Sequence, residues 1–254
     1  MVECWHLFML FGTGFVAGWV DSIAGGGGLI TIPVLLSVGL DPRAVLGTNK
    51  LQATFGSASA TWHYARAGAV PLSDCLRGFV ITFVCAAIGA CLVQRLSNDF
   101  LAKLIPLLLF AVAIYSLLRP NLGDSEARPR MGRLGFDWVF GLLIGFYDGF
   151  FGPGTGTFWA MAFVLMLGFN FTQATAYTKV MNFASNLSAL CLFLALGQVL
   201  MVPGITMGLG QLLGARIGSR MVLKHGTWLI RPVFTSVVIV LTLKLLYQAY
   251  GSRG

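Results

Sequence analysis

Charged residues are scarce in this chain. Aspartate, glutamate, lysine and arginine make up 10% of its 254 residues, and 57% are hydrophobic. A soluble domain carries about 25% charged residues, so this chain could not cover a water-exposed surface. The longest polar stretch, residues 119–133, is only of linker size. The sequence therefore predicts an all-α membrane protein without a soluble second domain.

Several other signals are missing. The N-terminus has neither a basic region nor a small-residue cleavage site, so we interpret it as the first membrane element and not as a signal peptide. The five cysteines show no CxxC or metal-type spacing, and the three histidines are scattered, so no metal site or cofactor is expected. The net charge of +8 comes from basic residues at the ends of apolar runs. This pattern is typical of orientation in a membrane and not of nucleic-acid binding.

The two halves of the chain are related in sequence. GWVDSIAGGG at 18–27 corresponds to GFYDGFFGPG at 145–154, which aligns Asp21 with Asp148. Further along, Lys50 in TNKLQATF corresponds to Lys179 in YTKVMNFA. The sequence predicts a first membrane repeat at 1–120, a basic linker at 121–133 and a second membrane repeat at 134–254.

Each repeat opens with an apolar segment that is too long for one span, residues 7–40 and 134–171, and glycines interrupt both segments. Ordinary spans follow at 44–65, 70–95, 99–119, 172–196, 201–222 and 229–249. Hydropathy alone would merge each opening segment and count about eight spans, whereas up to about ten helical elements are present if each segment is a hairpin.

The basic residues distinguish two topologies. If each opening segment crosses once, eight basic residues lie on one side of the membrane and seven on the other. If each is a hairpin, the split is ten to five, which is the asymmetry that the positive-inside rule expects, with the linker in the cytoplasm. We therefore predict inverted repeats, each a glycine-broken helical hairpin followed by three transmembrane helices.

Glycine clusters break both opening segments at matching positions. At such a break the backbone lacks helical partners, and a ligand can approach it closely. A helix that starts at Leu29 or Gly156 would direct its positive end and free N–H groups at the break, which suits an anion. Breaks in both inverted halves are typical of transporter binding sites. We expect these residues to bind substrate: Gly25, Gly26, Gly27, Gly28, Gly152, Gly154, Thr155 and Gly156.

Close helix packing is the alternative role for glycine. It is the interpretation that we favour for the glycines spaced by four residues, because small residues at that spacing let two helices approach. These glycines are Gly14, Gly18, Gly141, Gly145, Gly149, Gly210, Gly214 and Gly218.

Asp21 and Asp148 each follow a glycine by three residues, so they share its helix face. An acid within a membrane costs several kcal/mol unless it is paired, hydrated or protonated. Two roles stay open for these residues. They could couple transport to protons, or they could lock the hairpin by accepting N–H bonds from the glycine turn.

Lys50 and Lys179 lie seven or eight residues into their predicted helices, roughly 10–12 Å deep. Lys179, Asn182 and Asn186 form a polar stripe at i, i+3 and i+7. Lysine suits oxyanions, and amide groups add neutral donors, although snorkelling to the interface is the alternative for both lysines. We expect five substrate-binding residues here: Asn49, Lys50, Gln52, Lys179 and Asn182.

Three stretches occur in an order and spacing that resemble one family. They are GWVDSIAGGGGLITIPVLLSVGLDPRAVLGTNKLQATFGS, GFYDGFFGPGTGTFWAMAFVLMLGFNFTQATAYTKVMN and GARIGSRM, and they cover most of both halves. The chain resembles the sulfite exporter TauE/SafE family of membrane transporters. The resemblance implies a multi-pass secondary transporter of the bacterial inner membrane. It also implies a small sulfur-containing or organic anion as substrate, such as sulfite, thiosulfate, a sulfonate or a sulfoacid.

The motif residues that the resemblance carries over are Asp21 with 25–28, Asn49 and Lys50, Asp148 with 152–156, Lys179 and Asn182. Members differ in substrate and direction of transport. We hypothesise alternating access about this site, with the anion, protons and the lipid bilayer as partners.

Three alternatives stay open. A passive anion channel would use the same residues, but it would not show counterflow. A membrane-embedded enzyme would need a nucleophile beside a base or a metal cluster, and no such pairing is visible, so we expect no enzyme. A subunit that binds a soluble partner through the basic linker is the third alternative.

Overall fold

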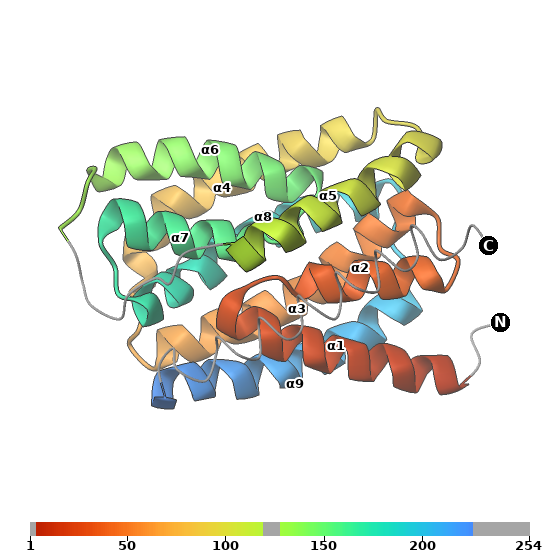
Figure 1. The fold of residues 1–254 in the computed structure, drawn as a ribbon, viewed down its shortest axis with the longest axis horizontal. Coiled ribbons are helices and arrows are strands. Elements are labelled where there is room, and N and C mark those ends of the chain that lie inside the picture. The colour runs from red at the N-terminus through yellow and green to blue at the C-terminus, as the bar shows by residue number, and fades with distance from the viewer. Residues whose placement is uncertain (1–3, 119–127, 226–254) are drawn as a thin grey trace.

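The computed structural model describes residues 4–118 and 128–225, which form helices and no strand (Figure 1). The helices are α1 (Cys4–Ala24), α2 (Gly27–Ser37), α3 (Pro42–Arg66), α4 (Leu72–Val93), α5 (Asn98–Leu118), α6 (Arg133–Phe150), α7 (Thr155–Leu167), α8 (Phe171–Ala195) and α9 (Met201–His225). The predicted all-α class is confirmed for this part of the chain. The span expected at 229–249 lies outside the described residues.

Three helices in the described ranges are long and apolar enough to cross a membrane. They are His6–Ala24 within α1, α4 and α8. The surface fits a lipid environment, because many large apolar side chains on the helices are exposed, among them Phe8, Leu76 and Leu107.

Capping residues explain where the long helices begin. Asp41 precedes α3, and its side chain accepts the Arg43 N–H at 2.9 Å, while proline occupies the first helical position. Asn170 precedes α8 and accepts the Gln173 N–H at 2.9 Å. The two short helices α2 and α7 have no such side-chain cap, and a glycine precedes each of them.

Both opening segments are pairs of helices joined at glycines. The turn from α1 to α2 has φ of 78° at Gly25 and 98° at Gly26, and the turn from α6 to α7 has 101° at Gly152 and 83° at Gly154. Only glycine adopts these angles readily, which is why the chain turns here. The expected helix starts were slightly wrong, because α2 begins at Gly27 and α7 at Thr155.

The returning helices are short. α2 has 11 residues and α7 has 13, so they measure about 17 and 20 Å at the rise of an α-helix. A bilayer core is about 30 Å thick. Neither returning helix is therefore long enough to cross the bilayer core.

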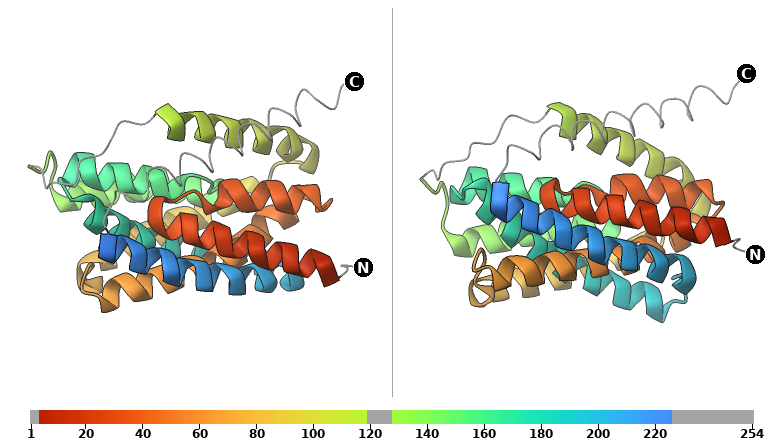
Figure 2. Two further views of the ribbon diagram at one scale, coloured as in Figure 1. Left: turned by 60° about the horizontal axis from the view of Figure 1, so that its bottom comes forward. Right: turned by 90° about the horizontal axis from the view of Figure 1, so that it is seen from below.

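The two halves of the chain pack reciprocally. The most extensive contacts join α1 to α9 and α4 to α6, so the first helix of each half lies against the fourth helix of the other. Figure 2 shows α1 and α9 side by side in both views. Gly14 and Gly18 lie against the α9 backbone, and Gly149 lies against Ala86 of α4, with no room for a Cβ. The predicted packing role of these spaced glycines is confirmed.

Corresponding helices run in opposite directions. α1 and α3 run from right to left in Figure 1, whereas α6 and α8 run from left to right. The bundle therefore has two ends. We call the end where α3 finishes and α4, α6 and α8 begin the basic end, because Arg66, Arg77, Arg128, Arg130, Arg133, Arg220 and Lys224 lie at these helix ends, in the preceding linker and in the last turns of α9.

An apolar cluster occupies each end of the bundle. The cluster at the basic end includes Tyr64 from the end of α3 and Tyr177 from the start of α8. The cluster at the opposite end includes Leu46 from the start of α3 and Phe193 from the end of α8. Buried polar side chains of α3 and α8 lie between the two clusters, and they form the candidate site.

Candidate functional site

The tips of the two hairpins meet inside the bundle. A Cβ on Gly25 would lie 2.6 Å from the Gly156 carbonyl carbon, and the Thr157 hydroxyl donates to the Ala24 carbonyl at 3.2 Å. Gly28 lies against Pro153 of the other hairpin. The helix starts of α2 and α7 thus converge on one region from opposite halves of the chain.

Lys50 of α3 pairs with Asp148 of α6. Its Nζ lies 2.7 Å from Asp148 Oδ1, and it also donates to the Asp148 carbonyl and to Asn186 Oδ1 at 3.3 Å. The Ser185 hydroxyl donates to the second Asp148 oxygen. The side chains of Lys50 and Asp148 are only 2% and 4% exposed. Both oxygens of this carboxylate therefore have partners within the protein.

Lys179 of α8 pairs with Asp21 of α1. Its Nζ lies 3.0 Å from Asp21 Oδ2 and also donates to the Asp21 carbonyl. Asp21 Oδ1 accepts the Gly27 N–H at 3.1 Å, which ties the end of α1 to the first turn of α2. This is the geometry of the hairpin lock. The Asp21 side chain is 21% exposed, whereas that of Lys179 is fully buried.

Both ion pairs join one half of the chain to the other. The sequence interpretation placed the lysines and the aspartates at depth, but it did not pair them. The sequence has two acids and two lysines at membrane depth, and this equal number indicated pairing, because a buried charge is stable only beside a partner. The pairing leaves the four groups with no net charge.

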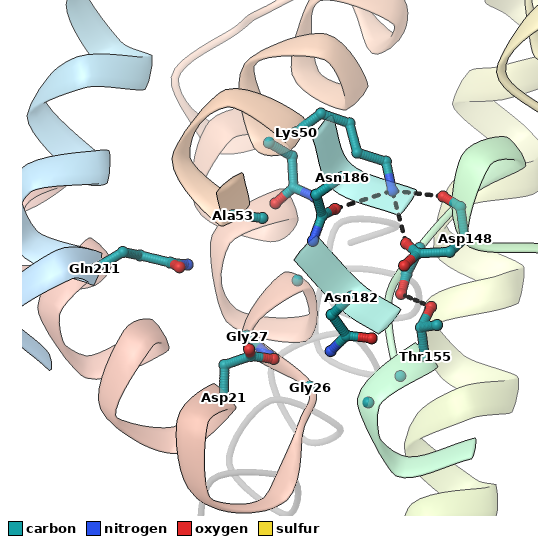
Figure 3. A pocket seen from close by; sticks show the side chains of 15 residues that line it. Asp21, Gly26, Gly27, Lys50, Ala53, Asp148, Thr155, Asn182, Asn186 and Gln211 are labelled. Carbon is teal, nitrogen blue, oxygen red and sulfur yellow. Dashed lines mark hydrogen bonds and ion pairs between the residues drawn. The ribbon is translucent and has the colours of Figure 1, made fainter. Parts of the chain in front are cut away.

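A cavity of about 30 Å³ lies beside the hairpin tips, lined by Asp21, Lys50 and Asp148 among others. Figure 3 shows these side chains around it. This volume is room for about two water molecules. Twelve of the expected site residues line it: Asp21, Gly26, Gly27, Gly28, Asn49, Lys50, Asp148, Gly152, Gly154, Thr155, Gly156 and Asn182.

Three expected site residues lie outside the cavity lining. Gly25 packs against Gly156. Lys179 contacts Asp21, which lines the cavity, but Lys179 does not line the cavity itself. Gln52 orients Asn49, because its Nε2 donates to Asn49 Oδ1 at 2.7 Å and to Thr31 Oγ1 at 3.1 Å.

The lining also includes three residues that sequence reasoning did not assign to the site, namely Ala53, Asn186 and Gln211. Asn186 belongs to the polar stripe of α8, so the sequence placed it on the same helix face as Lys179 and Asn182. Gln211 is 2% exposed within an apolar helix, and its side chain lies against Gly56 of α3. A polar residue in the glycine-rich stretch of α9 was the available signal.

The arrangement favours a small anion. Each helix start carries a partial positive charge and N–H groups without helical acceptors. The first turns of both α2 and α7 line the cavity, and the amides of Asn49, Asn182, Asn186 and Gln211 surround it. Because the ion pairs cancel, the helix starts decide the sign of the charge that the cavity prefers.

Comparisons with known proteins find membrane transporters as relatives of this chain. The family model described as sulfite exporter TauE/SafE matches residues 10–245. The Escherichia coli (strain K12) protein named "Probable membrane transporter protein YfcA" is 47% identical over 253 residues, which cover all of this chain and 94% of that protein. A "Probable membrane transporter protein" of Haemophilus influenzae is 45% identical and covers 95% of both chains. No solved structure matches the chain.

Proposed function

Because this chain belongs to the sulfite exporter TauE/SafE family of membrane transporters, we propose that it is a secondary transporter for a small sulfur-containing or organic anion in the bacterial inner membrane. The observation that carries the proposal is the convergence of two helix starts, α2 and α7, on one buried cavity beside neutralised ion pairs.

The proposed substrate is compact. The cavity is small, and its polar groups come from several directions, which suits an anion with oxygens on several sides. Sulfite, thiosulfate, a sulfonate group or a sulfoacid has this form. The helix starts supply the favourable potential, and the amide groups supply hydrogen bonds of fixed geometry.

The arrangement of the halves supports alternating access. We propose inverted repeats, supported by the opposite directions of α1 and α6 and of α3 and α8, and by the reciprocal contacts. The excess of basic residues at one end supports a cytoplasmic location for that end. Apolar clusters lie at both ends of the bundle, which supports exchange by movement of one half against the other.

Solid-supported-membrane electrophysiology on reconstituted protein tests the proposal. Jumps of sulfite, thiosulfate, sulfoacetate, taurine and chloride would be applied with and without a pH gradient. We expect a saturable current for a sulfur oxyanion. Counterflow of labelled substrate would separate a transporter from a passive channel, which shows no exchange stimulation. A wild-type protein with no current for any sulfur anion would contradict the proposed substrate class.

A further inference from the structure

A line of buried polar side chains runs along one face of α8. Thr175, Thr178, Asn182 and Asn186 are spaced by three or four residues, so they lie within a narrow arc of the helix. The last two line the cavity. Thr178 and Thr175 continue the line toward the basic end, about 6 and 10 Å beyond Asn182 by helical rise.

Three of these side chains carry an oxygen atom without a hydrogen-bond partner among the described residues. The hydroxyls of Thr175 and Thr178 and the Oδ1 atom of Asn182 accept and donate no hydrogen bond within residues 4–118 and 128–225. The residues are 2%, 1% and 5% exposed. A buried polar atom without a partner destabilises the folded state, so an apolar residue of the same shape would be more favourable at each threonine.

The corresponding region of α3 differs. Asn49 aligns with Thr178 in the repeat, and its Oδ1 accepts hydrogen bonds from Thr31 at 2.6 Å and from Gln52 at 2.7 Å. The Thr48 hydroxyl accepts the Leu200 N–H at 3.0 Å. The side-chain oxygens of Asn49 and Thr48 therefore have partners, whereas the hydroxyls of Thr175 and Thr178 do not, although Gln52 Oε1 and Thr61 Oγ1 of α3 are also unpaired in the described part of the chain.

We infer that Thr175, Thr178 and Asn182 line the path along which the anion and its water move between the cavity and the basic end. This inference rests on the proposed function and specifies a route for it. The free hydroxyls donate hydrogen bonds to the passing anion and so replace part of its hydration shell, because no protein group among the described residues accepts from them.

The path is closed in this structure. The residues beside the threonines, Ala174, Tyr177 and Val180, belong to the apolar cluster of the basic end together with Trp159. Arg133 lies over the Tyr177 ring, 4.9 Å from its centroid. Opening toward this end requires α8 to separate from the aromatic side chains of α7.

Valine substitutions test the path. Thr175→Val and Thr178→Val keep the side-chain shape and remove the unpartnered hydroxyl. We expect each variant to unfold at the wild-type temperature or higher, yet to transport the anion about fivefold more slowly, the effect of one lost hydrogen bond. Thr82→Val is the matched control, because Thr82 is buried on α4, does not line the cavity, and donates only a weak hydrogen bond to Met181 Sδ at 3.7 Å within the described residues.

Cysteine accessibility provides a second readout. In a variant without native cysteines, Thr175→Cys and Thr178→Cys would be exposed to the membrane-impermeant reagent sulfonatoethyl methanethiosulfonate. We expect both to react from the side of the basic end, with protection by the transported anion, and the Thr82→Cys variant to stay unreactive.

Two results would overturn the path while leaving the proposed function intact. In one, wild-type protein transports and both valine variants transport at the same rate. In the other, the cysteines at 175 and 178 react no faster than the one at 82. Wild-type protein that carries no anion would instead overturn the proposed function itself.

Discussion

The two ion pairs have the same composition but different surroundings. In the Lys50–Asp148 pair the ions are 2.7 Å apart, and Ser185 occupies the remaining carboxylate oxygen. In the Lys179–Asp21 pair the ions are 3.0 Å apart, and the Asp21 side chain is 21% exposed. Its other oxygen binds a backbone N–H of the hairpin. Both carboxylates line the cavity and have protein partners on both oxygens, so the pairs differ in the greater exposure of the Asp21 side chain.

The difference assigns separate roles to equivalent residues. The Asp148 carboxylate, held by lysine and serine, fastens α6 to α3 and α8. The Asp21 carboxylate lines the cavity with a larger exposed fraction, which leaves it the more accessible of the two. We therefore expect Asp21 to be the residue through which protons act, and Asp148 to act mainly on stability.

The largest expected effect comes from removing Lys50. Lys50→Ala leaves Asp148 charged and buried without its partner, which should lower the free energy of unfolding by about 3–5 kcal/mol. Thermal unfolding in detergent measures the change, with Lys103→Ala as an exposed control on α5. An unchanged unfolding temperature for Lys50→Ala would show that the pair does not hold the halves together.

Asparagine at the two acidic positions should separate their roles. We expect Asp148→Asn to lower the free energy of unfolding by about 3 kcal/mol. Asp21→Asn should cost about 1–2 kcal/mol, because the site is partly hydrated and the amide oxygen still accepts the Gly27 N–H.

Transport provides the functional half of the same comparison. Currents of Asp21→Asn should no longer respond to a pH gradient, whereas the remaining current of Asp148→Asn should still respond. Solid-supported-membrane recordings at two external pH values measure both. The reverse pattern would assign proton coupling to Asp148.

The smallest effect is expected for Ser185→Ala. It removes one hydrogen bond to the Asp148 carboxylate and leaves Lys50 in place, so the free energy of unfolding should fall by about 1.5 kcal/mol. The pH dependence of transport should stay as in the wild type. A shift of that pH dependence would mean that Asp148 also exchanges protons during transport.

Much of the site could be predicted from local sequence. The glycine breaks follow from conformational freedom, since only glycine takes the φ of 98° at Gly26 or 101° at Gly152 without strain. The polar face of α8 follows from helical period, because Lys179, Asn182 and Asn186 return to one side every three or four residues. The second half of the chain repeats the glycine break and the lysine-bearing helix in the same order as the first half.

Contacts between the halves could not be predicted in this way. Neither the spacing nor the composition of the sequence predicts the Lys50–Asp148 pair or the Lys179–Asp21 pair, because the partners come from different repeats. The same holds for Gln211, which reaches the cavity from α9. The inference about Thr175 and Thr178 likewise depends on which neighbours leave their hydroxyls unpaired.

The sequence by itself determined a helical membrane protein of two related halves, the positions of the breaks and the residues that face inward. The tertiary structure decided which charges cancel, which carboxylate is the more exposed and which end holds the unpaired hydroxyls of α8. The physical reason is the sequence separation over which each property is set. Backbone conformation and helix faces depend on residues a few positions apart, whereas the pairing of buried charges depends on how the two halves pack.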